Sequence, residues 1–270
     1  MAITALHAAA SGMRALDEKL NVVANNLANI NTHGFKRSRV NFEDLLYQIK
    51  RAPGIPNAED EPIPHGILVG TGVKVSGTQL NFAPGAVDTT GRPLDFQIEG
   101  EGFFQVNTVH DGDVIIAYTR AGNFVRNSLG NIVLGNSGGA VLEPPIVIPE
   151  DAIEISIGRN GEVRVRQQGA TTLNTVGQME LARFVNPEGL EQIGRNLYVE
   201  TDASGTPITA QPETDGLGAT VQGALEMSNV DPVRELIDLI TTQRAFELNS
   251  QTVRSADQTL EIVANLIRGF

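Results

Sequence analysis

The chain has 270 residues, a formal net charge of −12 and no cysteine. Disulfides and thiolate metal sites are therefore excluded, and no apolar run approaches the roughly 20 residues that a membrane span requires. Residues 1–50 and 226–270 together carry −1, so residues 51–225 carry −11. An acidic middle repels phosphate backbones, and we expect neither nucleic acid as a partner nor insertion into a membrane.

The first expected element is a helix from about Thr4 to Asn29, within an N-terminal helical segment of residues 1–46. The small residues of Ala8–Gly12 either allow another helix to approach closely or simply form a weak first turn. The N-terminus does not resemble a cleavable signal peptide. Further along, apolar residues alternate at the three- and four-residue steps of a coiled-coil stripe: Met13, Leu16, Leu20, Val23, Leu27 and Ile30.

Residues 47–95 are expected to form an extended linker region. Closely spaced prolines and neighbouring glycines exclude a helix between residues 53 and 66, so this stretch is predicted to be an extended loop. Weak alternation from Val69 to Leu80 then predicts one or two short strands. The whole predicted loop covers residues 47–66, and the residues that characterise it are Tyr47, Pro53, Pro56, Pro62 and Pro64.

Residues 96–209 are predicted to form an antiparallel β-domain. Three turn signals lie between alternating strands, at Asp111-Gly112, Gly130-Asn131 and Asn160-Gly161. Asp-Gly and Asn-Gly turns of this kind favour β-hairpins, and three hairpins in succession favour an antiparallel sheet.

A return linker, residues 210–227, is expected to lead into a long helix within residues 228–270. Asp231 is suited to cap this helix and Pro232 to occupy its first position. Asn249 either fixes helix register from a buried position or faces solvent at the margin of the stripe. The apolar stripe repeats every seven residues, with a second set of positions three residues later: Leu239, Phe246, Asn249, Val253, Leu260, Val263 and Ile267.

Together these elements predict an α+β fold. Its two terminal helices pair as a coiled-coil-like module, and a central antiparallel β-domain is joined to them by an extended β and loop region.

Patterns that are typical of catalytic or metal sites lack the surrounding sequence that such sites require. Gly135–Gly139 matches the G-x-S-x-G pattern of a hydrolase, but Pro144 and Pro145 follow where that pattern requires a helix. We therefore expect no enzymatic activity, no cofactor and no metal. The four histidines lie in four separate segments without the spacing of paired ligands: His7, His33, His65 and His110.

Three blocks of sequence carry a family resemblance. They are Ala24–Lys36, then Asp95–Val106 with Tyr118–Phe124, and finally Ser228–Asp231 with Gln243–Ser250. In this order they resemble the axial proteins of the bacterial flagellar rod and hook, and the match covers most of the chain.

The resemblance implies a structural subunit that polymerises head-to-tail into a rigid helical tube and transmits motor torque to the hook. The stretch 53–66 and the total length are typical of the distal part of the rod, with a proximal rod or hook-type subunit as the alternative. The two helical stripes would form the subunit interface, and the proline loop would stiffen the tube.

The same resemblance implies proximal rod proteins, the hook protein and the surrounding P and L ring proteins as partners. It also implies type III export and a place in the basal body between the periplasm and the outer membrane. Two other hypotheses remain: an enzyme that uses its helices only to dock, and a cap or adaptor of fixed stoichiometry.

Overall fold

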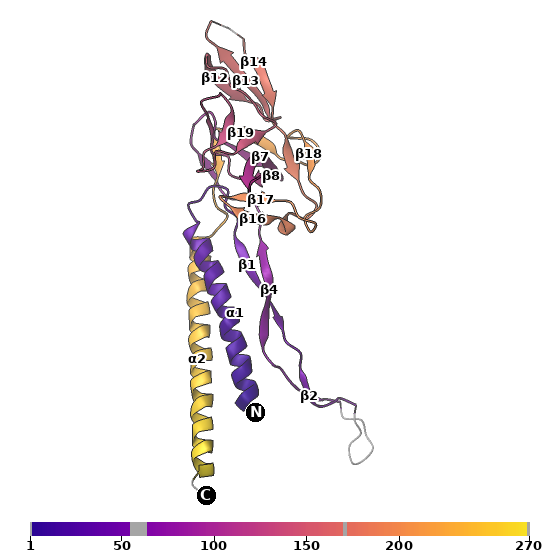
Figure 1. Ribbon diagram of the computed structural model, residues 1–270, viewed down its shortest axis with the longest axis vertical. Coiled ribbons are helices and arrows are strands. Elements are labelled where there is room, and N and C mark those ends of the chain that lie inside the picture. Colours follow the sequence, from indigo (N-terminus) through magenta and orange to yellow (C-terminus); the bar gives the residue numbers. More distant parts are fainter. Residues whose placement is uncertain (1, 55–63, 170–171, 269–270) are drawn as a thin grey trace. The chain divides into compact units, whose positions relative to one another are not determined.

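The computed structural model describes residues 2–54, 64–169 and 172–268, and it divides the chain into two compact units. Unit 1 comprises Met1–Ala28, Ser38–Gln79 and Asp231–Phe270. Unit 2 comprises Asn29–Arg37 and Leu80–Val230. Two helices bracket a mostly antiparallel β-structure, so the α+β class is confirmed (Figure 1).

The helices of unit 1 are α1, Ala2–Ala28, and α2, Pro232–Arg268. Their bounds lie within a few residues of those predicted. Asp231 caps α2, because its Oδ1 accepts hydrogen bonds from the backbone N–H groups of Val233 at 3.0 Å and Arg234 at 3.3 Å. Pro232 then occupies the first helical position, where its missing N–H costs nothing.

Unit 1 also contains two ribbons of two strands each. In the first, β1 (Ser38–Asp44) pairs with β4 (Val73–Leu80), and in the second, β2 (Gln48–Arg51) pairs with β3 (Ile67–Val69). The predicted loop is therefore strand over its first residues, with Gln48 opposite Val69 and Arg51 opposite Ile67. The residues of β2 do not alternate between apolar and polar, so only the pairing with β3 identifies them as a strand.

A nine-stranded antiparallel sheet is the largest element of unit 2. The three predicted hairpins are all present, and the Asp111-Gly112 turn has φ of 52° and 95°, as a two-residue hairpin turn requires. The strands of this sheet are β7 (Phe103–His110), β8 (Asp113–Thr119), β9 (Phe124–Arg126), β10 (Ile132–Leu134), β11 (Val141–Glu143), β15 (Leu181–Arg183), β16 (Glu191–Gly194), β17 (Leu197–Val199) and β18 (Ile208–Ala210).

Smaller sheets complete unit 2. A three-stranded sheet contains β12 (Ala152–Ile157), β13 (Glu162–Gln167) and β14 (Asn174–Gln178), and Pro187–Gly189 forms a single 3₁₀ turn, η1. Two pairs then join segments far apart in the sequence: β6 (Phe96–Glu99) with β19 (Ala219–Gln222), and β5 (Val87–Thr89) with β20 (Ala224–Glu226). The predicted return linker thus contains two strands, and their partners precede them by more than a hundred residues.

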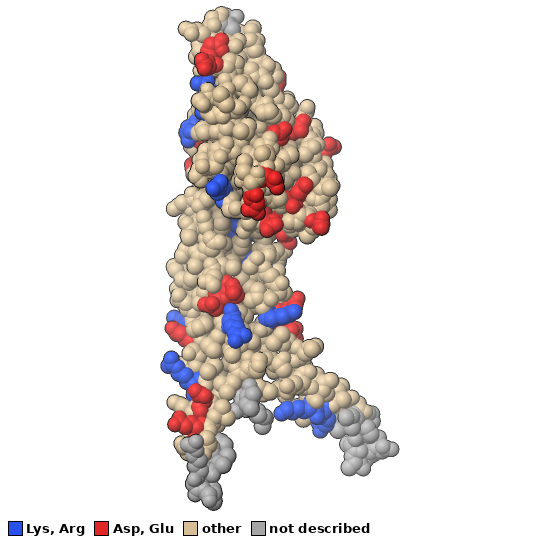
Figure 2. All heavy atoms as spheres, viewed as in Figure 1, with Lys and Arg blue, Asp and Glu red and all other residues tan. Residues whose placement is uncertain are grey.

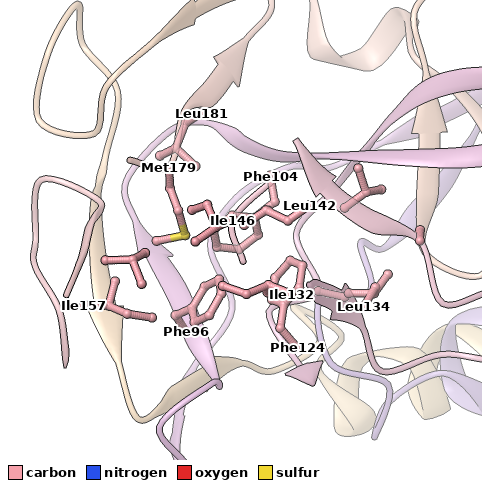
Figure 3. Close-up of a cluster of buried hydrophobic side chains, with 14 of the residues drawn as sticks. Phe96, Phe104, Phe124, Ile132, Leu134, Leu142, Ile146, Ile157, Met179 and Leu181 are labelled. Atoms are coloured by element: carbon pink, nitrogen blue, oxygen red, sulfur yellow. The ribbon is translucent and has the colours of Figure 1, made fainter. Parts of the chain in front are cut away.

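An aromatic cluster forms the centre of the unit 2 core (Figure 3). Phe96 stacks on Phe124 with ring centroids 4.7 Å apart, and Phe104 meets both rings edge to face. Gly122 lets the chain pass close to this cluster, since a Cβ there would lie 1.6 Å from the carbonyl oxygen of Phe96. Close packing at this position therefore explains why the Tyr118–Phe124 part of the family resemblance contains a glycine.

Beside this core, a second cluster of unit 2 contains two buried tyrosines, Tyr118 and Tyr198. Burial raises the pKa of each phenol to about 12, and the nearby Glu200 carboxylate adds to the effect at Tyr118. A charged phenolate is poorly solvated in such a site, so the neutral form is favoured in the folded state.

We expect unit 2 to lose stability between pH 10 and about 12. Unfolded tyrosines ionise near pH 10 whereas the folded ones remain protonated, so stability present below pH 10 is lost as pH rises through the folded pKa. Tyr47→Phe removes the one exposed tyrosine of the three. Tyrosinate absorbance of that variant should then report the buried pair, and ionisation of both phenols near pH 10 in the folded protein would contradict the prediction.

Candidate interaction surfaces

Asn26 links three elements of unit 1. Its side chain is 1% exposed, and its Nδ2 donates to the carbonyl of Ser38 at 2.8 Å and to Glu235 Oε2 at 3.2 Å. Its Oδ1 accepts from the Ser38 N–H at 3.0 Å. Because a buried amide must be satisfied by hydrogen bonds, this arrangement holds α1, the start of β1 and the first turn of α2 in one geometry.

A second contact shows how α1 and α2 run. The side-chain amide of Asn249 lies 3.2 Å from the position that a Cβ on Gly12 would occupy. From the Asn26–Glu235 hydrogen bond to this contact, the residue number falls by 14 along α1, from 26 to 12, and rises by 14 along α2, from 235 to 249. The two contacts are therefore two heptads apart on each helix. The helices therefore lie side by side and antiparallel (Figure 1), and the small residue Gly12 allows their close approach.

The predicted stripes largely coincide with the sides by which these helices meet. On α1, Val23 is buried, and on α2 Thr242, three residues after Leu239, is buried on the same side as the stripe. Ile30 is an exception because it lies beyond the end of α1, in a turn that belongs to unit 2. The remaining stripe residues that are half-buried are Met13, Leu16, Leu20, Leu27, Leu239, Phe246, Asn249 and Val253.

The C-terminal end of α2 extends beyond α1. In the register set by Gly12 and Asn249, the first residue of α1 lies opposite Thr259, so no α1 residue faces Leu260 or those that follow. Leu260 is accordingly 37% exposed. Val263 and Ile267 lie on this part of the helix, but their side chains are outside the described part of the structure.

A second apolar stripe on α2 was missed by the sequence analysis. Its residues lie three, four or eight positions apart on one side of the helix, and Val233 and Leu248 are each 64% exposed. A helix with apolar residues on more than one side has contact surface for more than one neighbour. Counting the same spacing on the far side of the helix would have found this stripe: Val233, Leu236, Ile237, Ile240 and Leu248.

The β2–β3 ribbon also exposes apolar side chains on both faces, with Ile49 at 66% on one and Ile67 at 47% on the other, and Leu46 just before β2 is 90% exposed. Two isolated strands are only marginally stable in water, so such a ribbon favours a further partner. The ribbons are fixed to α1 at the start of β4, where the Val73 N–H donates to Ser11 Oγ at 3.2 Å. A groove of about 770 Å³ lies beside this contact, between α1 and β4.

The predicted stiffening loop is only partly described. Tyr47, Pro53 and Pro64 are exposed. Pro56 and Pro62 lie outside the described residues.

In unit 2, one buried carboxylate holds the segments that enter and leave the unit. Glu226 is 2% exposed, and its Oε1 accepts from Lys36 Nζ at 2.6 Å and from the Gly85 N–H at 2.8 Å. Its Oε2 lies 3.3 Å from Arg120 Nη1. Burial lowers the pKa of both Lys36 and Arg120, and the negative charge of Glu226 opposes that effect at each.

Backbone contacts strengthen this junction. The Gly34 N–H donates to the carbonyl of Glu226 at 2.8 Å, and the Arg37 N–H donates to Asn229 Oδ1 at 2.8 Å. Asn229 in turn donates to the carbonyls of Asn81 and Ala83. Lys36, Arg120 and Asn229 each belong to one of the three resemblance blocks, so the blocks meet at one buried site.

Over the described residues no three His, Cys, Asp or Glu side chains are grouped as metal ligands, and neither helix is apolar enough along its length to cross a membrane. Asp and Glu side chains gather on the face of unit 2 that Figure 2 shows.

Comparison with known proteins matches three family profiles in chain order. Residues 6–36 match the flagella basal body rod protein, residues 97–165 the flagellar hook protein FlgE/F/G D1 domain, and residues 221–266 the flagellar basal body rod FlgEFG protein C-terminal region. The flagellar basal-body rod protein FlgG of Buchnera aphidicola from Schizaphis graminum is 44% identical over 98% of this chain and its own whole length.

Two proteins of Caulobacter vibrioides allow a comparison within one organism. Its flagellar basal-body rod protein FlgG is 44% identical, over 97% of this chain and 98% of that protein. Its flagellar basal-body rod protein FlgF is 34% identical, over 96% of this chain and 94% of that protein.

Replacing Glu226 with Gln should lower the free energy of unfolding of unit 2 by about 3–5 kcal/mol, because two buried cations then lack their counter-charge. Urea unfolding of the full chain measures this loss. Glu99→Gln is the matched control, since it removes an exposed pair with Arg159 in the same unit and should cost far less. Equal losses in the two variants would show that the buried cluster is not important for stability.

Proposed function

This chain belongs to the FlgG family of flagellar basal-body rod proteins, and on that premise we propose that it is a subunit of the distal rod. Copies polymerise head-to-tail into a rigid helical tube that transmits motor torque to the hook. A contact between two different surfaces of identical subunits, repeated without closing a ring, generates such an open tube.

The observation that carries the proposal is the two-sided apolar surface of α2. One side meets α1 of the same chain, while Val233, Ile237 and Leu248 remain exposed on another. Burying these residues against a neighbouring copy would supply hydrophobic stabilisation that the isolated chain lacks. The end of α2 beyond α1 offers a further surface, which contains Leu260.

The predicted stripes then have two roles. The half-buried residues between α1 and α2 assemble the helical module as a coiled-coil-like pair, and neighbouring modules pack around them to form the core of the tube. Asn249, half-buried beside Gly12, sets the register of the pair, because an amide tolerates only alignments that satisfy it.

The Pro-rich loop between β2 and β3 supplies the stiffness. It bridges to an adjacent subunit and resists the sliding that bending requires. Prolines suit this role because they restrict the conformations of an extended bridge.

A proximal rod or hook-type subunit is the alternative position. The higher identity to FlgG than to FlgF of the same organism, 44% against 34%, favours the distal rod. In that position the partners are the proximal rod proteins, the hook protein and the P and L ring proteins. The protein is exported by the type III apparatus, lies in the basal body from the periplasmic to the outer-membrane level, and has a mechanical rather than an enzymatic role.

Ile237→Asp or Leu248→Asp should block polymerisation while the monomer stays folded, because a carboxylate on the exposed stripe would be buried without a partner at the interface. Val109→Asp, which places a carboxylate at an exposed apolar position of unit 2, is the control. Sedimentation at rising concentration measures assembly, and circular dichroism checks folding. Normal polymers from both variants would exclude the stripe from the interface, and a fixed oligomer from the wild type would favour a cap or adaptor.

Replacing Gly54–His65 with Asn-Gly should leave polymerisation intact but make the rods bend. The short turn still connects β2 and β3, and both helices are unchanged, so only the bridge to the neighbour is lost. Electron microscopy of isolated rods measures their curvature. Rods as straight as the wild type would place the stiffness elsewhere, and an absence of rods would mean that the loop is needed for assembly.

A further inference from the structure

Each helix of unit 1 has an outer side, which is turned away from the other helix. Gly12 of α1 lies against Asn249 of α2, and Arg14 follows Gly12 by two residues. Because two residues turn an α-helix by about 200°, Arg14 is on the outer side of α1. Arg244 follows the buried Thr242 by the same interval, so Arg244 is on the outer side of α2.

The outer side of α2 is largely apolar and exposed. It contains the second apolar stripe, and Arg244 lies within that stripe between Ile240 and Leu248. These two neighbours are 41% and 64% exposed. The α1 helix of the same chain is on the opposite side of α2, so a surface that covers this stripe has to come from another molecule.

The outer side of α1 leads into the groove between α1 and β4. Ala10 and Arg14 line the groove from the helix, and Val73 and Val75 line it from the strand. The lining therefore combines apolar side chains with charged ones, as a surface that receives an amphipathic helix requires.

Both outer sides carry two opposite charges three residues apart. On α1 these are Arg14 and Asp17, and on α2 they are Arg244 and Glu247. All four side chains are exposed, and within the part of the chain that the structure describes none of them forms an ion pair or a hydrogen bond.

The order of these charges selects one direction of contact. If α2 of a second copy lies antiparallel to α1, Arg244 meets Asp17 and Glu247 meets Arg14. A parallel arrangement with the two pairs level places like charges opposite each other. Charges beside an apolar seam set the orientation of paired helices in this way.

The antiparallel alignment also brings the apolar residues of the stripe onto α1. Ile237 is then level with Ala24, which is exposed and precedes Asn26 by two residues, and so lies on the outer side. Leu248 is level with Met13, beside the groove. Covering these exposed side chains supplies hydrophobic stabilisation along the whole contact.

We propose that the outer side of α1 is the docking surface for the exposed α2 stripe of a second copy of the chain. The two helices lie antiparallel, with Asp17 against Arg244 and Arg14 against Glu247. The inference rests on the proposed polymerisation and names the surface that receives its apolar stripe. Because the two surfaces lie on opposite sides of the helix pair, each copy contacts one neighbour through each of them, and the contact can repeat without limit.

Exchange of the charges tests the pairing. Arg14→Glu alone and Glu247→Arg alone should each raise the concentration needed for polymerisation several-fold, because like charges then face each other across the contact. The double variant with both substitutions should restore the wild-type concentration. Sedimentation at rising concentration measures assembly, and circular dichroism checks folding.

The matched control combines Arg14→Glu with Glu261→Arg, which makes the same change of charge on the same helix. Glu261 is exposed and lies on α2 beyond the start of α1, so its substitution should not restore assembly. Equal recovery in this control, or no recovery with Glu247→Arg, would overturn the pairing and leave the proposed function intact.

Cysteine cross-linking tests the contact itself, since the chain has no cysteine of its own. Chains with Ala24→Cys are mixed with chains with Ile237→Cys, polymerised under reducing conditions and then oxidised. A disulfide-linked dimer should form several-fold faster than when Thr252→Cys replaces Ile237→Cys. Thr252 is also exposed on α2, but it lies about 22 Å further along the helix axis.

Each outcome of the cross-linking decides the matter. Polymers that form without the faster cross-link would overturn this docking surface and leave the proposed function intact. Ile237→Cys chains that link mainly to one another would pair the stripe with itself and overturn α1 as its partner. A wild-type chain that does not polymerise would refute the proposed function and this inference with it.

Discussion

Burial of the Glu226 carboxylate between Lys36 and Arg120 is the constraint on which the rest of unit 2 depends. Three charges with almost no exposure are costly to desolvate, and together they are tolerated only in an arrangement that satisfies every one of them. That arrangement brings together the segment after α1, the end of β8 and the end of β20. It therefore fixes where the chain enters and leaves the β-structure, and its value lies as much in selecting one geometry as in net stability.

Unit 1 is held together differently, by contacts between its two helices. Asn26 and Glu235 join α1 to α2 by a polar contact at one level, and Gly12 with Asn249 allows close approach two heptads away. Much of the apolar surface of α2 remains uncovered by α1, in the stripe through Val233 and Leu248 and at Leu260. An isolated chain leaves that surface in water, and in the polymer that we propose, neighbouring copies would cover it and gain hydrophobic stabilisation.

Local patterns predicted the elements whose signals are contained in short stretches of sequence. Asp111-Gly112 and Asn160-Gly161 specify hairpin turns through backbone conformations that glycine and Asn or Asp adopt readily, so their strands were found. Asp231-Pro232 similarly marked the start of α2. The β19 and β20 strands were missed because their partners, β6 and β5, lie far away in the sequence, and Ile30 was placed on a helix that ends at Ala28.

The sequence by itself determined the α+β class, the two helices with their heptad stripes, the hairpins and the family, because periodicity, turn chemistry and ordered motifs are properties of neighbouring residues. Only the tertiary structure decided that Lys36, Arg120 and Glu226 form one buried cluster and that α2 carries a second exposed stripe. These features depend on which segments meet in space, and a single sequence does not record the long-range pairing and burial that bring them together.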